Sequence, residues 1–234
     1  MLRIKDLNAY YGQSHVIQGV SLEVRSGEIV SLIGRNGAGK TTILKSIMGI
    51  EVRRQGHIEF QGEDISKFKT YAVVRKGIAF VPEERRIFPN LSVRENLNLG
   101  MLRIDKRDRK PILDEVLAYF PILRERLTQK GGSMSGGEQQ MLTVARALVS
   151  KPKLMLIDEP SEGLMPMIVD TLAQAIQHAN EAGVTILLVE QNIELALQQL
   201  GGRTYIIDQG TIQFAGDAHI VLASEEIKQR FLLI

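Results

Sequence analysis

An α/β fold with a mostly parallel sheet is predicted by three features of the sequence. The apolar, strand-like segment 28–33 runs into a glycine-rich loop and then into a helical segment. Helical and strand-like segments alternate again over 154–214, which is typical of a parallel sheet covered by helices on both faces. The long stretch between these regions is mostly helical in pattern. We therefore expect one domain over 1–234, with a core formed by about 1–88 and 151–234 and a helical subdomain of about 89–150 inserted into it.

The first strands are predicted from short apolar or alternating runs that end at glycine or polar turns. After the third run we expect the helix Thr42–Gly49, for which Gly49 provides a C-terminal stop. The charged run Arg103–Lys110 is interpreted as a solvated loop between two inserted helices. The expected strands are Leu2–Leu7, Val20–Val24, Glu28–Ile33, His57–Phe60 and Gly77–Val81, and the inserted helices are Val93–Leu99, Pro111–Phe120 and Gly137–Val149.

The C-terminal part returns to alternating strands and helices, beginning with the strand Leu154–Ile157. Far more residues separate this strand from the helix at 42–49 than one crossover connection needs, which is why we infer an insertion. The segments that follow are helix Met167–Ala182, strand Val184–Val189, helix Asn192–Leu200, and strands Thr204–Ile207 and Thr211–Phe214.

Composition excludes several classes of protein. Apolar residues make up 44% and charged residues 24% of the 234 residues, as in a globular protein with a core. Cysteine is absent, so neither a disulfide framework nor a cysteine-ligated metal is expected. No apolar run reaches the roughly 18–20 residues that span a bilayer, and residues 1–6 lack the apolar part of a signal peptide. The formal net charge of +2 is too small to indicate nucleic-acid binding, and a cytosolic location is the default expectation.

The glycine-rich loop 34–41, GRNGAGKT, matches the P-loop pattern G-x-x-x-x-G-K-[ST]. In such a loop backbone N–H groups surround phosphates, Lys40 is expected at the β- and γ-phosphates, and the hydroxyl of Thr41 at Mg²⁺. A side chain on Gly37 or Gly39 would block the close approach of the backbone. The alternative is a glycine-rich turn that binds no nucleotide. Such a turn would usually lack the strand before it and the helix after it.

A second motif indicates a second phosphate-binding helix N-terminus. Residues 133–140 are SMSGGEQQ, so Ser135, Gly136 and Gly137 open a helix whose first N–H groups are available to an anion. A P-loop alone indicates only a nucleoside triphosphate. One chain rarely needs two phosphate-binding segments for one nucleotide. The second motif therefore narrows the class of nucleotide-binding protein that the sequence can represent.

Two adjacent acids follow the apolar strand 154–157. A carboxylate at the end of a buried strand is costly unless it serves a cation or a hydrogen-bond network, and Mg²⁺ is the natural partner of Asp158. Glu159 is placed to polarise an attacking water as a general base. Adjacent acids after a strand are often just part of a turn, which is the alternative interpretation.

The two motifs together resemble the ATP-binding-cassette (ABC) ATPases, in which each nucleotide lies between the P-loop of one subunit and the signature segment of another. The resemblance covers essentially the whole chain in the family's order: aromatic, P-loop, Q-loop, signature, acidic pair, D-loop and switch. It implies a P-loop NTPase core of the ABC ATPase type, with a mostly parallel sheet, an N-terminal antiparallel β subdomain and an inserted helical subdomain. ATP and Mg²⁺ are the implied cofactors.

The resemblance also implies roles for individual residues. An aromatic ring stacks on adenine in this family, and Tyr11 is at that position, although Tyr10 or a purely structural tyrosine are alternatives. The implied catalytic residues are Lys40, Glu159 and Gln191, and the implied metal ligands are Thr41, Glu83 and Asp158. The implied nucleotide-binding residues are Tyr11, Gly34, Asn36, Gly37, Ala38, Gly39, Lys40, Thr41, Thr42, Ser135, Gly136, Gly137 and Glu138.

Three positions depart from the usual family pattern. Glu83 replaces the Q-loop glutamine, Gln191 stands where most relatives have histidine, and Met165 stands where many have aspartate. Glutamine still donates an N–H and glutamate is a competent Mg²⁺ ligand, so these departures do not imply an inactive enzyme. The spellings VPE with RRIFP, SGGEQQM and LVEQN together resemble the shorter ATPase subunit of branched-chain amino acid importers. The ATPase of urea and short-chain amide importers is a near neighbour.

The function implied is that of an ATP-hydrolysing subunit that powers a membrane importer, with branched-chain amino acids as the expected solute. The expected partners are a second ABC ATPase subunit, identical or a longer relative, and transmembrane permease subunits that contact the chain near Glu84–Leu91. A solute-binding protein would be an indirect partner, no nucleic acid is expected, and the chain would lie at the cytoplasmic face of the plasma membrane. The alternatives are a lipopolysaccharide exporter ATPase, against which the switch sequence argues, and a soluble ABC ATPase that acts on ribosomes or DNA.

Overall fold

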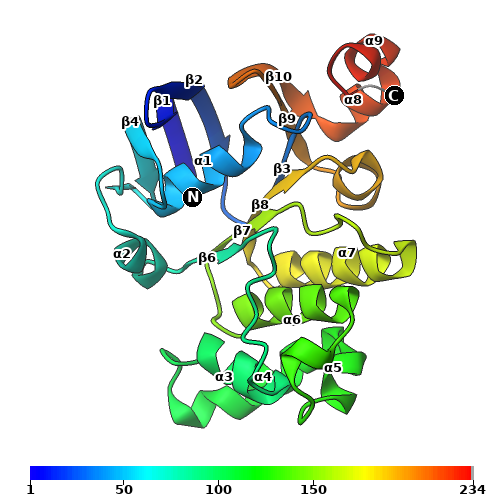
Figure 1. Ribbon diagram of the computed structural model, residues 1–234. Helices are drawn as coiled ribbons and strands as arrows, with labels where there is room; N and C mark the ends of the chain where they lie inside the picture. The colour runs from blue at the N-terminus through cyan, green and yellow to red at the C-terminus, as the bar shows by residue number, and fades with distance from the viewer. Residues whose placement is uncertain (233–234) are drawn as a thin grey trace.

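A six-stranded sheet forms the centre of the computed structural model, which describes residues 1–232 (Figure 1). The strand order is β10-β9-β3-β8-β7-β6, and every neighbouring pair is parallel except β10 with β9 at one edge. The predicted α/β class with a mostly parallel sheet is therefore confirmed. The strands are β3 (Ile29–Ile33), β6 (Ile78–Val81), β7 (Leu154–Asp158), β8 (Thr185–Glu190), β9 (Arg203–Asp208) and β10 (Thr211–Asp217).

Both faces of this sheet are covered, which explains why its inner strands are almost continuously apolar. Successive side chains of β7 point to opposite faces. Leu154 and Leu156 pack in a core shared with α1 (Lys40–Met48) and the second sheet, whereas Met155 and Ile157 pack in a core shared with the helices of the inserted region.

The second sheet is antiparallel and has the order β2-β1-β4-β5. Its hairpin extends well beyond the predicted strands 2–7 and 20–24, because the polar segment between them also pairs across the turn. Tyr10 pairs with His15 there, and the two rings stack with their centroids 4.3 Å apart. The strands are β1 (Leu2–Tyr11), β2 (Ser14–Val24), β4 (Arg53–Phe60) and β5 (Glu63–Asp64), and the short helix α2 (Thr70–Arg75) follows them.

The inserted region is helical and lies at one end of the molecule (Figure 1). One expectation was wrong: Lys106–Lys110, part of the charged run interpreted as a loop, forms the first turns of a helix. A solvated helix face carries charges as readily as a loop does, and Pro111 removes only one hydrogen bond near the helix start. The elements are α3 (Val93–Gly100), α4 (Lys106–Tyr119), α5 (Pro121–Glu125), η1 (Gly131–Ser133) and α6 (Gly136–Leu148).

The C-terminal helices complete the cover of the central sheet. The expected helix 192–200 is a shorter π-helical turn, and the last three helical segments were not predicted from the sequence. No helix in the described part of the chain is long and apolar enough to cross a membrane. The elements are α7 (Pro166–Glu181), η2 (Glu194–Gln199), α8 (Ala218–Ala223), α9 (Glu225–Ile227) and η3 (Lys228–Leu232).

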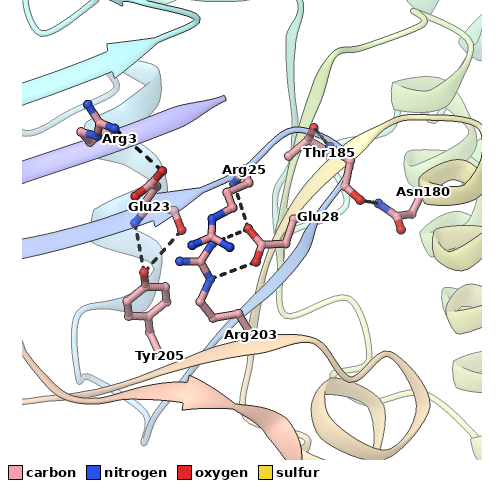
Figure 2. A network of polar contacts seen from close by, with 9 residues as sticks. Arg3, Glu23, Arg25, Glu28, Asn180, Thr185, Arg203 and Tyr205 are labelled. Carbon is pink, nitrogen blue, oxygen red and sulfur yellow. Dashed lines mark hydrogen bonds and ion pairs between the residues drawn. The ribbon is translucent and has the colours of Figure 1, made fainter.

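A polar network joins the two sheets at the amino ends of the parallel strands (Figure 2). Arg203 donates two hydrogen bonds to Glu28, from Nε to Oε1 over 2.9 Å and from Nη2 to Oε2 over 2.5 Å. The backbone N–H of Glu23 in β2 donates to the hydroxyl of Tyr205 in β9 over 3.1 Å. Burial opposes ionisation of Glu28, but the hydrogen bonds from Arg203 and from the N–H of Arg25 hold its pKa below the ordinary value. The network fixes the edge of the sheet opposite to the glycine-rich loop.

Candidate active site

The candidate site lies at the carboxyl ends of β3, β7 and β8, which are neighbours in the sheet. In an open parallel sheet this edge is where ligands bind. The glycine-rich loop follows β3, Glu159 follows β7, and Gln191 follows β8. The topology thus gathers three of the predicted segments from distant parts of the chain.

Two glycines shape the loop after β3. Gly39 has a φ of 110°, a conformation that side chains disfavour, and a Cβ there would lie 2.5 Å from the Cδ1 of Ile17. Gly34 has an ordinary φ, but a Cβ there would lie 2.3 Å from the carbonyl oxygen of Ile207. The loop therefore packs its backbone directly against β2 and β9. The exposed positions Asn36 and Gly37 form its outer rim, while Ala38, Gly39 and Lys40 are buried.

Lys40 links the glycine-rich loop to the acid after β7. Its ammonium lies 3.0 Å from Oε1 of Glu159 and donates to the carbonyl oxygens of Gly34, over 2.8 Å, and Arg35, over 3.1 Å. The side chain is almost fully buried, so the charge has an anionic partner in place. Lys40 and Glu159 thus form a largely buried ion pair between the two segments.

Asp158 and Thr41 form the second contact between these segments. The hydroxyl of Thr41 donates to Oδ1 of Asp158 over 3.0 Å, and Thr42 continues the helix behind them as a buried residue. Burial raises the pKa of Asp158 to about 7; Glu159 and Glu83 add to the shift, and the hydrogen bond from Thr41 opposes it. The Thr41 hydroxyl and the Asp158 carboxylate are oxygen ligands of the kind that divalent cations bind. A cation there would also stabilise the charged form of this buried carboxylate.

The stability of the protein should therefore depend on pH through Asp158. Its pKa is about 7 when folded and near its ordinary value of 3.8 when unfolded. The folded state keeps a proton that the unfolded state releases, so the free energy of unfolding falls as pH rises through this window and levels off above it. In thermal melts from pH 5 to pH 8 without nucleotide or metal, Asp158→Asn should lose Tm less steeply than the wild-type protein. Equal slopes would contradict this assignment.

Glu159 adopts an unusual backbone conformation, with a φ of 42°. Non-glycine residues with positive φ cost free energy and cluster at functional sites. Its N–H donates to the carbonyl oxygen of Val189 over 2.9 Å, which holds the turn against β8. The turn directs the carboxylate back toward Lys40, so the acidic pair is more than a generic polar turn.

Glu83 follows β6, the next strand beyond β7. Burial, a hydrogen bond with Glu162 and the nearby charge of Glu159 raise its pKa. Glu83 also contributes to the raised pKa of Asp158, so the two carboxyl groups share one electrostatic environment. A cation placed among them would relieve this repulsion.

The two tyrosines at the end of β1 differ in accessibility. Tyr10 is occupied on both sides: its ring stacks on His15, and the guanidinium of Arg53 lies 4.4 Å from its centroid. Tyr11, by contrast, is 37% exposed. Tyr11 is therefore the ring available to a planar ligand beside the glycine-rich loop.

The signature motif forms the N-terminus of α6. Ser135 caps the helix, and Glu138 completes the capping box by accepting from the Ser135 N–H over 2.8 Å. Glu138 also pairs with Arg126 at 3.1 Å, so its side chain holds the helix start in place rather than pointing to solvent. No hydrogen bond or ion pair among the described residues joins Ser135, Gly136 or Gly137 to the glycine-rich loop.

β8 ends in Glu190, a residue that the sequence analysis did not single out, and Gln191 follows it. Gln191 is exposed, with its backbone N–H donating to Oε2 of Glu190 over 3.0 Å. Glu190 is 1% exposed, and burial raises its pKa against the effect of N–H donors from Asn192 and Ser161. The available signal was an acid at the end of a mostly apolar strand. In the sequence analysis this signal was applied to Asp158 and not to Glu190.

Comparison with known proteins decides the family. A family model described as ABC transporter matches residues 17–162, more than half of the chain. The chain belongs to the ABC transporter family. It is 44% identical to the high-affinity branched-chain amino acid transport ATP-binding protein BraG of Pseudomonas aeruginosa over 99% of both chains. It is 37% identical to the lipopolysaccharide export system ATP-binding protein LptB of Escherichia coli K12, covering 99% of this chain and 96% of LptB.

Solved structures agree with the ABC transporter assignment. The fold matches a structure described as an ATP-binding subunit of an ABC transporter with a TM-score of 0.84 and 28% identity, over 99% of this chain and 96% of that one. The predicted ABC ATPase fold is thus confirmed, as is an ATPase whose activity is coupled to transport. The bounds of the helical subdomain and the roles of single residues stay predictions.

Proposed function

We propose that this chain is the ATP-hydrolysing subunit of a membrane importer for branched-chain amino acids. The observation that carries the proposal is the similarity to BraG, which extends over essentially the full length of both chains at 44% identity. The transported solute is not expected to contact this subunit. Its task is to convert ATP binding and hydrolysis into a movement of its partners.

The nucleotide would occupy the edge of the sheet described above. Tyr11 would stack on adenine, and the N–H groups of the loop from Gly34 to Thr42 would surround the phosphates. Lys40 would exchange its contact with Glu159 for the β- and γ-phosphates. The buried ammonium and its 3.0 Å contact with a carboxylate support this role, because an anion already sits there.

A magnesium ion would be held by Thr41, Asp158 and Glu83. The 3.0 Å contact between the Thr41 hydroxyl and Asp158, together with the mutual repulsion of the acids around them, fits an oxygen-ligated cation. The bound ion would neutralise charge on the phosphates. Ionisation of Asp158 would accompany its binding.

Hydrolysis would proceed in a dimer. Glu159, released from Lys40, would accept the proton of the attacking water, and the side-chain amide of Gln191 would donate to the γ-phosphate. The N-terminus of α6 in the partner subunit, with Ser135, Gly136 and Gly137, would close the site from the other side. The absence of described contacts between these residues and the P-loop of their own chain is consistent with such an arrangement.

Replacement of Gln191 tests the proposed phosphate contact. A hydrogen bond to a charged group contributes roughly 1.5–3 kcal/mol, so Gln191→Ala should lower turnover by about one to two orders of magnitude if the bond strengthens in the transition state. Gln191→His should stay active and gain a new ionisation in its pH–rate profile near pH 6–7, because the ordinary histidine pKa is about 6.5. The measurement is phosphate release at saturating Mg-ATP from pH 5.5 to pH 8.5.

The exposed Gln174 on α7 gives a matched control, since Gln174→Ala makes the same chemical change away from the site. Its turnover should equal that of the wild-type protein. Full turnover in Gln191→Ala would show that Gln191 does not sense the γ-phosphate.

Permease subunits would bind next to the Glu84–Leu91 segment. Phe88 in this segment is 50% exposed, and the guanidinium of Arg146 lies 5.5 Å from its ring centroid. Tyr71 on α2 and Leu102 after α3 are also exposed apolar side chains, at 61% and 68%. Exposed apolar side chains near the helical region give an integral membrane partner a surface to bury.

The proposal is tested by co-purification and transport. Detergent-solubilised membranes should yield the tagged chain together with integral membrane subunits, and the chain should not co-sediment with ribosomes. That result would also place it at the membrane through its partners. The reconstituted complex in proteoliposomes should take up leucine or valine with ATP and should not take up urea.

Lipopolysaccharide export is the second candidate function, because LptB is 37% identical over almost the whole chain. The two functions make opposite predictions for partner identity. Co-purification with lipopolysaccharide-binding membrane subunits, with no leucine-stimulated ATP hydrolysis in the complex, would favour export over import.

A further inference from the structure

Glu190 is a buried carboxylate to which the proposed function assigns no role. It is the last residue of β8 and is 1% exposed. An ionised carboxylate at such a depth is costly unless hydrogen-bond donors surround it. The donors around Glu190 come from two separate loops, so its side chain connects these loops to each other.

Both oxygens of the carboxylate are used, each by a different loop. Oε1 accepts from the backbone N–H of Ser161 over 3.0 Å. Oε2 accepts from the N–H groups of Gln191, over 3.0 Å, and Asn192, over 2.9 Å. Ser161 lies in the loop between β7 and α7, two residues after Glu159, and Gln191 begins the loop after β8.

These bonds continue the pairing of β7 and β8 past the point where the strands end. The last register pair is Asp158 with Val189, and the N–H of Glu159 still reaches the carbonyl oxygen of Val189 over 2.9 Å. Beyond it the two backbones diverge, and the Glu190 side chain supplies the acceptors that a strand would have supplied. The loops are thereby tied together next to the phosphate end of the site.

We infer that Glu190 is a positioning residue for ATP hydrolysis, holding the Glu159 turn and Gln191 in a fixed relation. This inference rests on the proposed function, in which Glu159 is the base and Gln191 contacts the γ-phosphate. The base and the phosphate donor follow different strands, β7 and β8. A shift of either by about 1 Å would misalign the attacking water, which is sufficient to slow catalysis about a hundredfold.

A glutamine cannot replace this carboxylate. An amide has one acceptor oxygen, and its NH₂ group has only donors. Whichever way the amide of Glu190→Gln is turned, either the Ser161 N–H or the N–H groups of Gln191 and Asn192 face another donor. The substitution is close to isosteric. It therefore removes hydrogen bonds that join the two loops without leaving a cavity in the core.

The first test compares phosphate release by Glu190→Gln with that of Thr185→Val. Thr185 is buried at the other end of β8, where its hydroxyl accepts from the N–H of Gly27 over 2.9 Å, so its replacement also removes one acceptor from a loop N–H. Glu190→Gln should lower kcat about tenfold to a hundredfold, with KM for ATP within about twofold of wild type. Thr185→Val should lower the Tm and leave kcat within about twofold.

Wild-type kcat in a folded Glu190→Gln variant would overturn the inference. An equal loss of kcat in Thr185→Val at the same loss of Tm would also overturn it, because Glu190 would then act only through stability.

The second test needs no catalysis. In the nucleotide-free protein, amide hydrogen exchange at Ser161, Gln191 and Asn192 should accelerate together in Glu190→Gln by about tenfold or more, whereas Thr185→Val should leave these amides unchanged. Unchanged exchange at all three amides would overturn the inference, whatever the ATPase activity of the variant. If Glu190→Gln shows this exchange pattern but the wild-type protein releases no phosphate from ATP, the proposed function is contradicted and the hydrogen-bond role of Glu190 is not.

Discussion

Replacement of Glu159 by glutamine should abolish ATP hydrolysis while leaving ATP bound. The amide is nearly isosteric but cannot take a proton, and removal of a general base lowers turnover typically by a factor of about 10²–10⁴. The geometry adds a second expectation. The ammonium of Lys40 lies 3.0 Å from Oε1 of Glu159, and a neutral amide at this position would not compete with phosphate for that ammonium. ATP affinity should therefore be equal to that of the wild-type protein or higher.

The trapped state should be a dimer with ATP between the P-loop of one subunit and Ser135 of the other. Size-exclusion chromatography of Glu159→Gln with Mg-ATP measures this, alone and together with the second ATPase subunit of the complex. Glu181→Gln on the exposed end of α7 makes the same change far from the site and should hydrolyse ATP normally. A Glu159→Gln variant that binds ATP but stays monomeric in both samples would refute the sandwich arrangement.

Replacement of Lys40 by alanine should remove both hydrolysis and tight nucleotide binding. The ammonium contacts Glu159 and the carbonyl oxygens of Gly34 and Arg35, and its charge would face the γ-phosphate. Loss of a preorganised donor at the reacting phosphate costs at least about a hundredfold in turnover. Phosphate release and titration with a fluorescent ATP analogue give the two quantities.

Two further variants separate charge from packing. Lys40→Met keeps most of the buried side-chain volume and should be as inactive as Lys40→Ala. Lys67→Ala removes an exposed lysine outside the site and should leave both quantities unchanged. Wild-type turnover in either Lys40 variant would be incompatible with the P-loop assignment.

The parts of the fold that were predictable from sequence are those with a strong local pattern. The strand, glycine-rich loop and helix around Lys40 form a continuous motif, and the apolar run before Asp158 was predicted as the strand that the structure shows. The hairpin of β1 and β2 was predicted too short because its polar tip is held by cross-strand partners, such as Tyr10 with His15, that no local window shows.

The candidate site was likewise predictable only where a local motif marks its residues. Residue types in motifs pointed to Lys40, Thr41 and Asp158, and the structure brings these side chains together. Neither the pairing of Lys40 with Glu159 nor the hydrogen bonds that Glu190 accepts from two loops could be predicted. Both depend on where strands far apart in the chain end relative to one another, which is a property of sheet order and not of any segment.

The contact between Lys40 and Glu159 has a consequence for the turnover cycle. In the proposed site, the carboxylate would compete with phosphate for the same ammonium, which would exchange one anion for the other when nucleotide binds and again when it leaves. After cleavage, the departing phosphate would compete with a tethered carboxylate whose local concentration does not change. This competition would weaken the binding of ATP and favour the release of phosphate.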